Sequence, residues 1–71
     1  MHYLVVVERG PTSYGAYVPD LPGCVAVGET QDEALSLIRE AIELHLEDLK
    51  DEGQPTPLPS STSALVEVEA V

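Results

Sequence analysis

The segment Val18-Pro-Asp-Leu-Pro-Gly-Cys24, followed after Val25-Ala-Val27 by Gly28-Glu-Thr-Gln-Asp-Glu-Ala-Leu35, decides the fold of this chain. Pro22 is locked near the φ that the first central position of a β-turn requires, and Gly23 can adopt the positive φ that a type II turn requires next. The chain is therefore expected to reverse its direction between Leu21 and Cys24.

A helix start follows this turn. Thr30 and Glu33 are spaced as a capping box, in which the threonine hydroxyl accepts a hydrogen bond from the Glu33 amide and the Glu33 carboxylate accepts one from the Thr30 amide. The spacing predicts a helix from Gln31 to about Asp51. Gly53 is placed to end this helix, because glycine readily adopts the left-handed conformation that commonly follows a last helical turn.

Three strands are expected before the helix. Residues His2 to Glu8 include three consecutive valines, whose β-branched side chains favour a strand, and we expect a central strand there. Turn-forming residues at 9–13 connect it to a second strand over Tyr14–Val18, and Cys24–Gly28 follows the Pro-Gly turn as a third, shorter strand. The pattern predicts an antiparallel hairpin sheet.

The C-terminal third has a different composition. Residues 54–63 contain three prolines together with serines and threonines, which exclude a helix and predict an extended connector within one domain that spans residues 1–71. In residues 65–71 two glutamates alternate with valines, which predicts a strand with one solvent-facing side. The expected fold is α+β in the order β-β-β-α-β, with one helix packed on one face of the sheet and the last strand parallel to the first, beside it.

The predicted helix has an apolar side about 140° wide, the breadth of a helix that packs on a sheet. This side consists of Ala34, Leu35, Ile38, Ala41, Ile42, His45, Leu46 and Leu49. Leu37 and Leu44 lie beyond its edge and form a second, narrow strip bordered by Asp48. Either this strip contacts another chain, or a curled sheet or the proline connector covers it.

Composition limits the functions open to the chain. A chain of 71 residues buries only about 60% of the surface that its unfolded form exposes, so self-association or a partner is expected. Its formal charge of −10 opposes direct binding to nucleic acid and favours a basic partner. No apolar run approaches the roughly 20 residues that span a bilayer, and no secretory signal is present, so we expect a cytoplasmic protein without membrane contact.

The residues with chemical potential are explained by structural roles. His45 lies on the apolar side of the helix without a second metal ligand nearby, and His2 is expected to open a strand. Cys24 has no neighbouring histidine to act as a base and is interpreted as a packing residue. Asp20 is interpreted as a turn residue that bonds nearby amides. We therefore expect no catalytic residue, metal or cofactor, and no enzymatic activity.

Two tyrosines complete the set of candidate contact residues. Tyr14 and Tyr17 fall on one predicted strand, next to Tyr3 on the first, and could stack on RNA bases. Because no basic residues accompany them, cross-strand packing or a protein interface is favoured. Together with Leu37, Leu44 and Asp48, these two tyrosines are the residues expected at a partner or dimer interface.

The Pro-Gly turn, the short strand after it, Gly28-Glu-Thr30 and Glu33-Ala-Leu35 resemble the HicB family, the antitoxin half of HicA/HicB toxin–antitoxin pairs. The resemblance continues through Glu40-Ala-Ile42 to Gly53 and the following prolines, and so covers nearly the whole chain. It implies a partial ribonuclease H-like domain without catalysis, often dimeric or in larger assemblies. Many members carry a C-terminal DNA-binding part as well, and this sequence, which ends after its last expected strand, resembles a member without one.

The resemblance also implies a partner. HicB-like proteins bind HicA, a small basic ribonuclease that cleaves mRNA, and block its activity. Our leading hypothesis is therefore a non-catalytic, antitoxin-like module that masks a HicA-type toxin. The alternative is a stand-alone homodimeric structural or small-ligand-binding module, which would pair through the leucine strip or the open sheet. A metal-dependent nuclease is disfavoured, because the first predicted strand carries valines where converging carboxylates would be needed.

Overall fold

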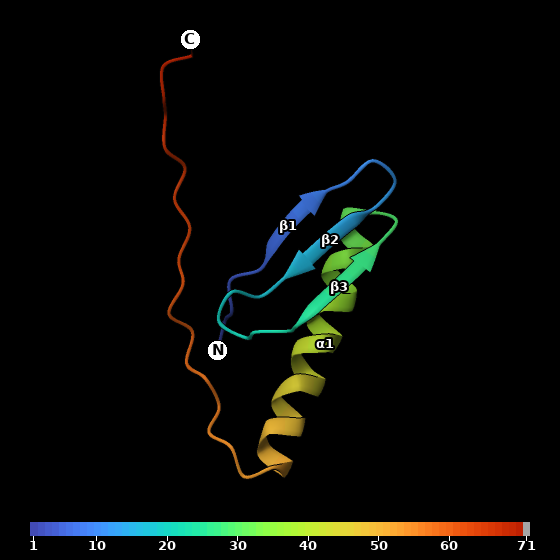
Figure 1. The fold of residues 1–71 in the computed structure, drawn as a ribbon, viewed down its shortest axis with the longest axis vertical. Helices are drawn as coiled ribbons and strands as arrows, with labels where there is room; N and C mark the ends of the chain where they lie inside the picture. Colours follow the sequence, from blue (N-terminus) through green and yellow to red (C-terminus); the bar gives the residue numbers. More distant parts are fainter. Residues whose placement is uncertain (71) are drawn as a thin grey trace.

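A single long helix lies across one face of a three-stranded antiparallel sheet, and an extended segment leaves the far end of the helix (Figure 1). The computed structural model describes residues 1–70. The elements are β1 (Val6–Arg9), β2 (Tyr14–Tyr17), β3 (Val25–Gly28) and α1 (Gln31–Asp51). The sheet order is β1-β2-β3, so β2 is the central strand. Among the described residues, no helix combines the length and apolar character that a membrane crossing requires.

The Pro-Gly turn forms as predicted and sets the register of the sheet. The Cys24 amide donates to the Leu21 carbonyl over 3.1 Å, and Gly23 has a φ of 84°. A second turn precedes it, in which the Leu21 amide donates to the Val18 carbonyl. These turns bring Tyr17 opposite Val25 in the antiparallel ladder between β2 and β3.

Both helix ends agree with the sequence. The Thr30 hydroxyl accepts from the Glu33 amide over 3.1 Å, and the helix begins at Gln31 as predicted. The expected return bond is different: the Glu33 carboxylate accepts from the amide of Glu29, one residue before the cap. At the other end Gly53 has a φ of 71°, and its amide donates to the Lys50 carbonyl, which confirms its predicted role in ending the helix.

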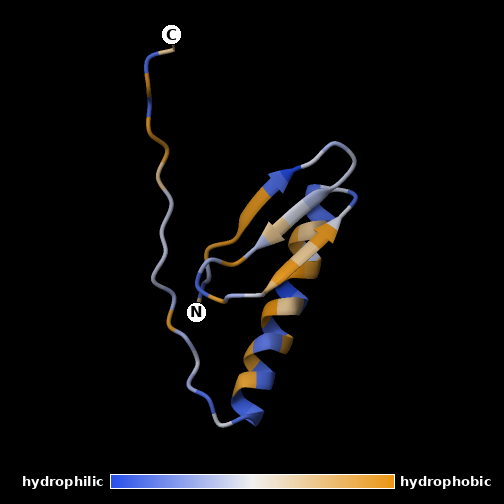
Figure 2. Ribbon diagram, viewed as in Figure 1, coloured by the Kyte–Doolittle hydropathy of each residue, from blue (hydrophilic) through white to orange (hydrophobic). Residues whose placement is uncertain are grey.

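The core lies between α1 and the inner face of the sheet (Figure 2). Its fully or nearly buried residues are Ala16, Val18, Leu21, Cys24, Ala34 and Ile38. The strands have four residues each, about 13 Å, whereas 21 helical residues extend about 31 Å. The sheet therefore covers the first half of α1 well, and Ile42, Leu46 and Leu49 in the second half are only half-buried.

The N-terminal strand is shorter than predicted. It begins at Val6 instead of His2, where its ladder with β2 ends opposite Tyr17. Beyond this point β2 has no continuation, because the chain turns at Val18 and the next residue, Pro19, has no amide hydrogen to donate. Residues 1–5 continue beside α1 outside the ladder.

The predicted C-terminal strand is not formed. Residues 54–70 contain no helix or strand, and they run past the sheet and away from it (Figure 1); Val71, the last residue of the predicted strand, lies outside the described residues. Strand β1 is consequently an edge strand rather than a central one. The physical reason is that the connector is fixed at its root to the turn between β2 and β3, and the residues beyond that attachment lie clear of β1.

Candidate protein-binding surfaces

The sheet has one face that α1 does not cover, and this face is largely apolar. Tyr17 is 40% exposed there, Val25 64% and Val27 65%. Gly15 of β2 pairs with Glu8 of β1 on one side and with Val27 of β3 on the other. The space above Gly15 is open, since a Cβ there would meet no atom within 4 Å. We call these five residues the open sheet face. Figure 1 is viewed from its side, with the strands in front of α1.

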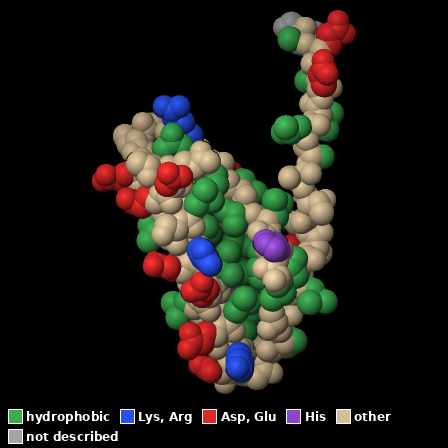
Figure 3. Space-filling model, turned by 180° about the vertical axis from the view of Figure 1, so that it is seen from behind, with side chains coloured by type: hydrophobic (Ala, Val, Ile, Leu, Met, Phe, Trp, Pro, Cys, Tyr) green, Lys and Arg blue, Asp and Glu red, His purple; other side chains and the backbone are tan. Residues whose placement is uncertain are grey.

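A groove lies at the other side of β1, where the N-terminal residues approach the helix. It has a volume of about 570 Å³. Its apolar lining includes Met1, Val5, Leu35, Ile38, Ile42 and Leu46. We call this cavity the edge groove, because it lies between α1 and residues 1–5, the segment that leads into the edge strand β1. Figure 3 shows hydrophobic side chains gathered at the centre of this face of the molecule, between acidic side chains and the extended C-terminal segment.

The side of α1 turned away from the sheet is acidic and carries the two leucines outside the core. Leu37 is 38% exposed and Leu44 60%, so neither the sheet nor the connector covers the strip, and that expectation is wrong. The acidic residues of the helix are Asp32, Glu33, Glu40, Glu43, Glu47, Asp48 and Asp51. Among the described residues one ion pair relieves this charge: Arg39 Nε lies 3.6 Å from a Glu43 carboxylate oxygen, with both side chains mostly exposed. Such a pair contributes little stability.

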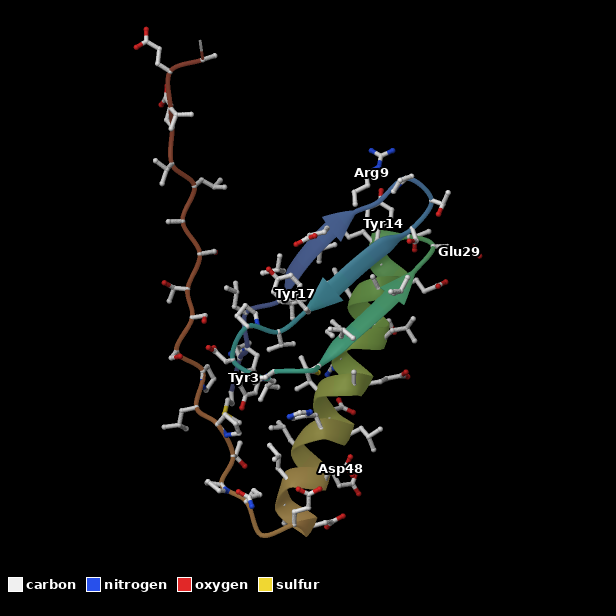
Figure 4. The ribbon with its side chains drawn as sticks, viewed as in Figure 1. Tyr3, Arg9, Tyr14, Tyr17, Glu29 and Asp48 are labelled. Atoms are coloured by element: carbon white, nitrogen blue, oxygen red, sulfur yellow. The ribbon has the colours of Figure 1, made fainter. Side chains whose placement is uncertain are left out.

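The five residues predicted at an interface do not form one surface. Leu37, Leu44 and Asp48 lie together on α1, whereas Tyr17 lies on the open sheet face (Figure 4). Tyr14, three residues before Tyr17, points to the opposite side of the sheet and packs against the core. The structure therefore separates the two tyrosines, and it supports two distinct candidate surfaces.

The sequence missed one site, the attachment of the connector. The Asp20 carboxylate accepts four hydrogen bonds, from the amides and hydroxyls of Ser60 and Ser61, over 2.7 to 3.0 Å. It was expected to bond amides of its own turn, and instead it binds residues about 40 positions away. The Tyr3 hydroxyl donates to the Pro57 carbonyl nearby. We call the contacts of Asp20 with the two serines the Asp20 clamp.

The clamp changes the acidity of Asp20. The amide of Ser61, then that of Ser60 and the Ser61 hydroxyl, stabilise the charged carboxylate and lower the pKa of Asp20 from 3.8 to about 2. The only signal for this contact in the sequence was a pair of serines after Pro59 in the connector. A carboxylate in one loop and hydroxyls in another can pair in many ways, so the sequence does not select this one.

Chemical catalysis finds little support in the geometry. Cys24 is buried in the core, and burial raises the pKa of its thiol, which keeps it protonated and unreactive. Within residues 1–70 no three His, Cys, Asp or Glu side chains are grouped so as to hold a metal ion. His2 lines the edge groove, and His45 is half-buried on α1.

Comparison with known proteins decides the family. The family model described as "HicB_like antitoxin of bacterial toxin-antitoxin system" matches residues 3–70. The chain belongs to the HicB-like antitoxin family. Its fold is similar to the crystal structure of the N-terminal domain of the Burkholderia pseudomallei antitoxin HicB, with a TM-score of 0.72 and 39% identity over 82% of this chain and 69% of that one.

Relatives of this HicB-like chain come from bacteria and archaea. It is 51% identical over 45 residues to a UPF0150 protein of Helicobacter pylori, which covers 63% of this chain and 62% of the relative. It is 40% identical to a UPF0150 protein of Thermoplasma acidophilum over 80% of this chain and 84% of the relative. It is also 31% identical to "Antitoxin HicB 2" of Photorhabdus laumondii over 99% of this chain, but spans only 51% of that protein.

The comparisons support the overall order of three antiparallel strands and a helix, as in the Burkholderia domain. The matched family model and the Photorhabdus relative are both described as antitoxins, and the chain spans less than two thirds of the Helicobacter and Photorhabdus relatives. The likeness to a ribonuclease H domain stays a prediction.

Proposed function

We propose that this HicB-like chain binds a small basic toxin of the HicA type and blocks its cleavage of mRNA. The observation that carries the proposal is the family match over residues 3–70. It is supported by the charge of −10, which attracts a basic protein and accelerates their encounter. Because mRNA is the substrate of such a toxin, we place the complex in the cytoplasm.

The leucine strip of α1 is the best docking centre for this toxin. Leu37 and Leu44 are two helical turns apart, about 10 Å along the axis, and both are exposed. Exposed carboxylates, among them Glu40, Glu47 and Asp48, surround them. An apolar centre with a charged rim is the usual composition of a specific protein interface. The leucines would supply buried contact area, and the carboxylates would pair with Lys or Arg of the toxin.

Co-purification with the small basic protein encoded beside this gene tests the function. The toxin alone should cleave an mRNA substrate, and cleavage should fall as this chain is added in stoichiometric amounts. Binding should weaken as salt rises, since the partners carry opposite charges. Absence of both binding and inhibition would reject the antitoxin function.

Leu44→Asp tests the docking surface. It places a charge at the centre of the strip and should weaken toxin binding at least about tenfold, because an unpaired charge is costly to bury. Leu58→Asp is the matched control: it makes the same change at a connector residue that is 78% exposed, and should bind the toxin as the natural chain does. Equal binding by both variants would exclude the strip as the docking centre.

The alternative, a stand-alone homodimeric module, is supported by the apolar open sheet face, where Val25 and Val27 are both about two-thirds exposed. It predicts self-association with no effect on the toxin. If Leu44→Asp leaves the mass in solution unchanged, pairing through the helix is excluded for such a dimer.

A further inference from the structure

Strand β1 has a free edge suited to accept another strand. The sheet order β1-β2-β3 leaves one side of β1 without a neighbour within the described residues. Edge strands are commonly protected from pairing by short length, charged side chains, proline or a bulge. The two charged residues of β1, Glu8 and Arg9, stand at its C-terminal end, whereas Val5, Val6 and Val7 form an uncharged run around its beginning. Its unpaired amides and carbonyls can therefore receive a strand.

The edge groove lies between α1 and the residues that lead into β1. Tyr3 and Val5 line one side of it, and the half-buried Ile42 and Leu46 of α1 form its apolar floor. A strand on the edge of β1 that continues past Val6 toward residues 3–5 would lie over this floor. The groove exists because three strands are too few to cover the second half of the helix. A fourth strand beside β1 would place alternate side chains into this cavity of about 570 Å³ and bury its floor.

The C-terminal segment has the matching pattern. Residues 62–70 are extended and exposed, with Val66 and Val68 each 79% exposed. In an extended segment these valines share one side with Ala70, and Glu67 and Glu69 share the other with Leu65. One side is thus suited to an apolar groove and the other to solvent.

The attachment of this segment favours a second copy of the chain as its acceptor. The Asp20 clamp holds Ser60 and Ser61 at the turn between β2 and β3, and residues 62–70 leave from there and run clear of their own β1 (Figure 1). On their own β1 they would have to run parallel to it, as after any helical crossover. The segment of a second copy is free to pair antiparallel, which is slightly more stable.

We propose that two copies of this chain exchange their C-terminal segments. Residues 65–70 of each copy form a strand on the free edge of β1 in the other copy, and Val66 and Val68 enter the edge groove there. Each copy carries one donor segment and one acceptor site, so a two-fold arrangement closes the exchange and leaves neither unpaired. The inference concerns a surface separate from the leucine strip and does not rest on the proposed toxin binding.

Charge gives this assembly a distinctive salt dependence. Each chain carries a formal charge of −10, so two copies repel each other, and added salt should strengthen their association. Added salt should instead weaken the binding of a basic toxin, because that complex joins opposite charges. The two interactions can therefore be separated by the same titration, and the failure of one does not imply the failure of the other.

Sedimentation of the full chain over a range of concentrations and salt tests the exchange. Val68→Asp places a charge on the side that enters the groove and should raise the dimer dissociation constant at least about tenfold. Leu65→Asp adds the same charge on the opposite side and should leave the dimer nearly unchanged. Both residues are exposed in the single chain, so both variants are expected to fold, and circular dichroism would verify this.

Hydrogen exchange identifies the strand itself. The amides of residues 65–70 should become protected as the protein concentration rises, and Val68→Asp should remove this protection. Protection that is independent of concentration would place the segment on its own β1 and overturn the proposal. A chain that remains monomeric, or a dimer that Val68→Asp leaves intact, would overturn it as well.

Discussion

Gly28→Ala should strongly destabilise this protein, for a reason visible only in its packing. Gly28 ends β3, where the strand passes the first turn of α1. A Cβ at this position would lie 2.6 Å from the backbone nitrogen of Ala34 and 3.1 Å from its Cα. Contacts under 3 Å force a displacement, and the atoms that must move belong to a helix turn that the Thr30 cap holds in place.

Gly28→Ala should lower the free energy of unfolding by about 1 to 3 kcal/mol, the usual effect of overpacking a rigid site. A domain of this length has a total stability of about 4 to 11 kcal/mol, at roughly 0.05 to 0.15 kcal/mol per residue. The substitution therefore removes a large share of it. For a loss of about 2 kcal/mol, the melting temperature should fall by roughly 8 to 16 °C.

Thermal and urea unfolding followed by circular dichroism measure this effect. Gly15→Ala is the matched control: a Cβ there meets no atom within 4 Å, and the melting temperature should stay equal or rise slightly, since alanine loses less backbone entropy than glycine. Ala34→Gly should not rescue Gly28→Ala, because the clash is with backbone atoms. Equal melting of Gly28→Ala and the natural chain, or rescue by Ala34→Gly, would refute the reasoning.

Further variants test the cap, the core and the Asp20 clamp. Thr30→Ala removes the hydroxyl that accepts from the helix and should cost about 1 kcal/mol in urea unfolding; an unchanged midpoint would contradict the cap. Ile38→Ala empties a site that is 2% exposed and should cost about 2 to 5 kcal/mol, whereas Leu44→Ala, on the exposed strip, should change unfolding little. Because the folded pKa of Asp20 is lowered from 3.8 to about 2, its bonds to the serines should persist above pH 3.8 and be lost as the pH falls toward 2. The amide chemical shifts of Ser60 and Ser61 should change over this pH range in the natural chain. Asp20→Asn should abolish the change. An equal pH-dependent change in Asp20→Asn would exclude the clamp.

The parts of the fold that were predicted correctly depend on short stretches of backbone. Pro22 and Gly23 specify their turn because only these residues combine a fixed φ with access to a positive one, and the turn forms with a Gly23 φ of 84°. Thr30 and Gly53 specify the helix ends through hydrogen bonds to residues three or four positions away. Both helix bounds were therefore predictable to the residue.

The parts that were missed depend on contacts between distant segments. The strand predicted over residues 65–71 is not formed within the described residues, because an alternating pattern alone does not bring the segment to a sheet edge. Tyr14 and Tyr17 were expected together as contact residues, and the alternation of β2 separates them onto two faces. The edge groove was not predicted, because it forms where the three-stranded sheet leaves one side of α1 uncovered beside residues 1–5.

The sequence by itself determined the turn, the helix bounds, the apolar side of the helix and the acidic charge, because each depends on residue type and local spacing. It also carried the motifs of the HicB-like family. Tertiary structure alone decided that Asp20 holds the connector through residues 40 positions away and that Gly28 must lack a side chain to pass α1. It also decided that β1 has no neighbour on one side within residues 1–70. These features require the path of the chain in space, since side chains distant in sequence meet only after the backbone has folded.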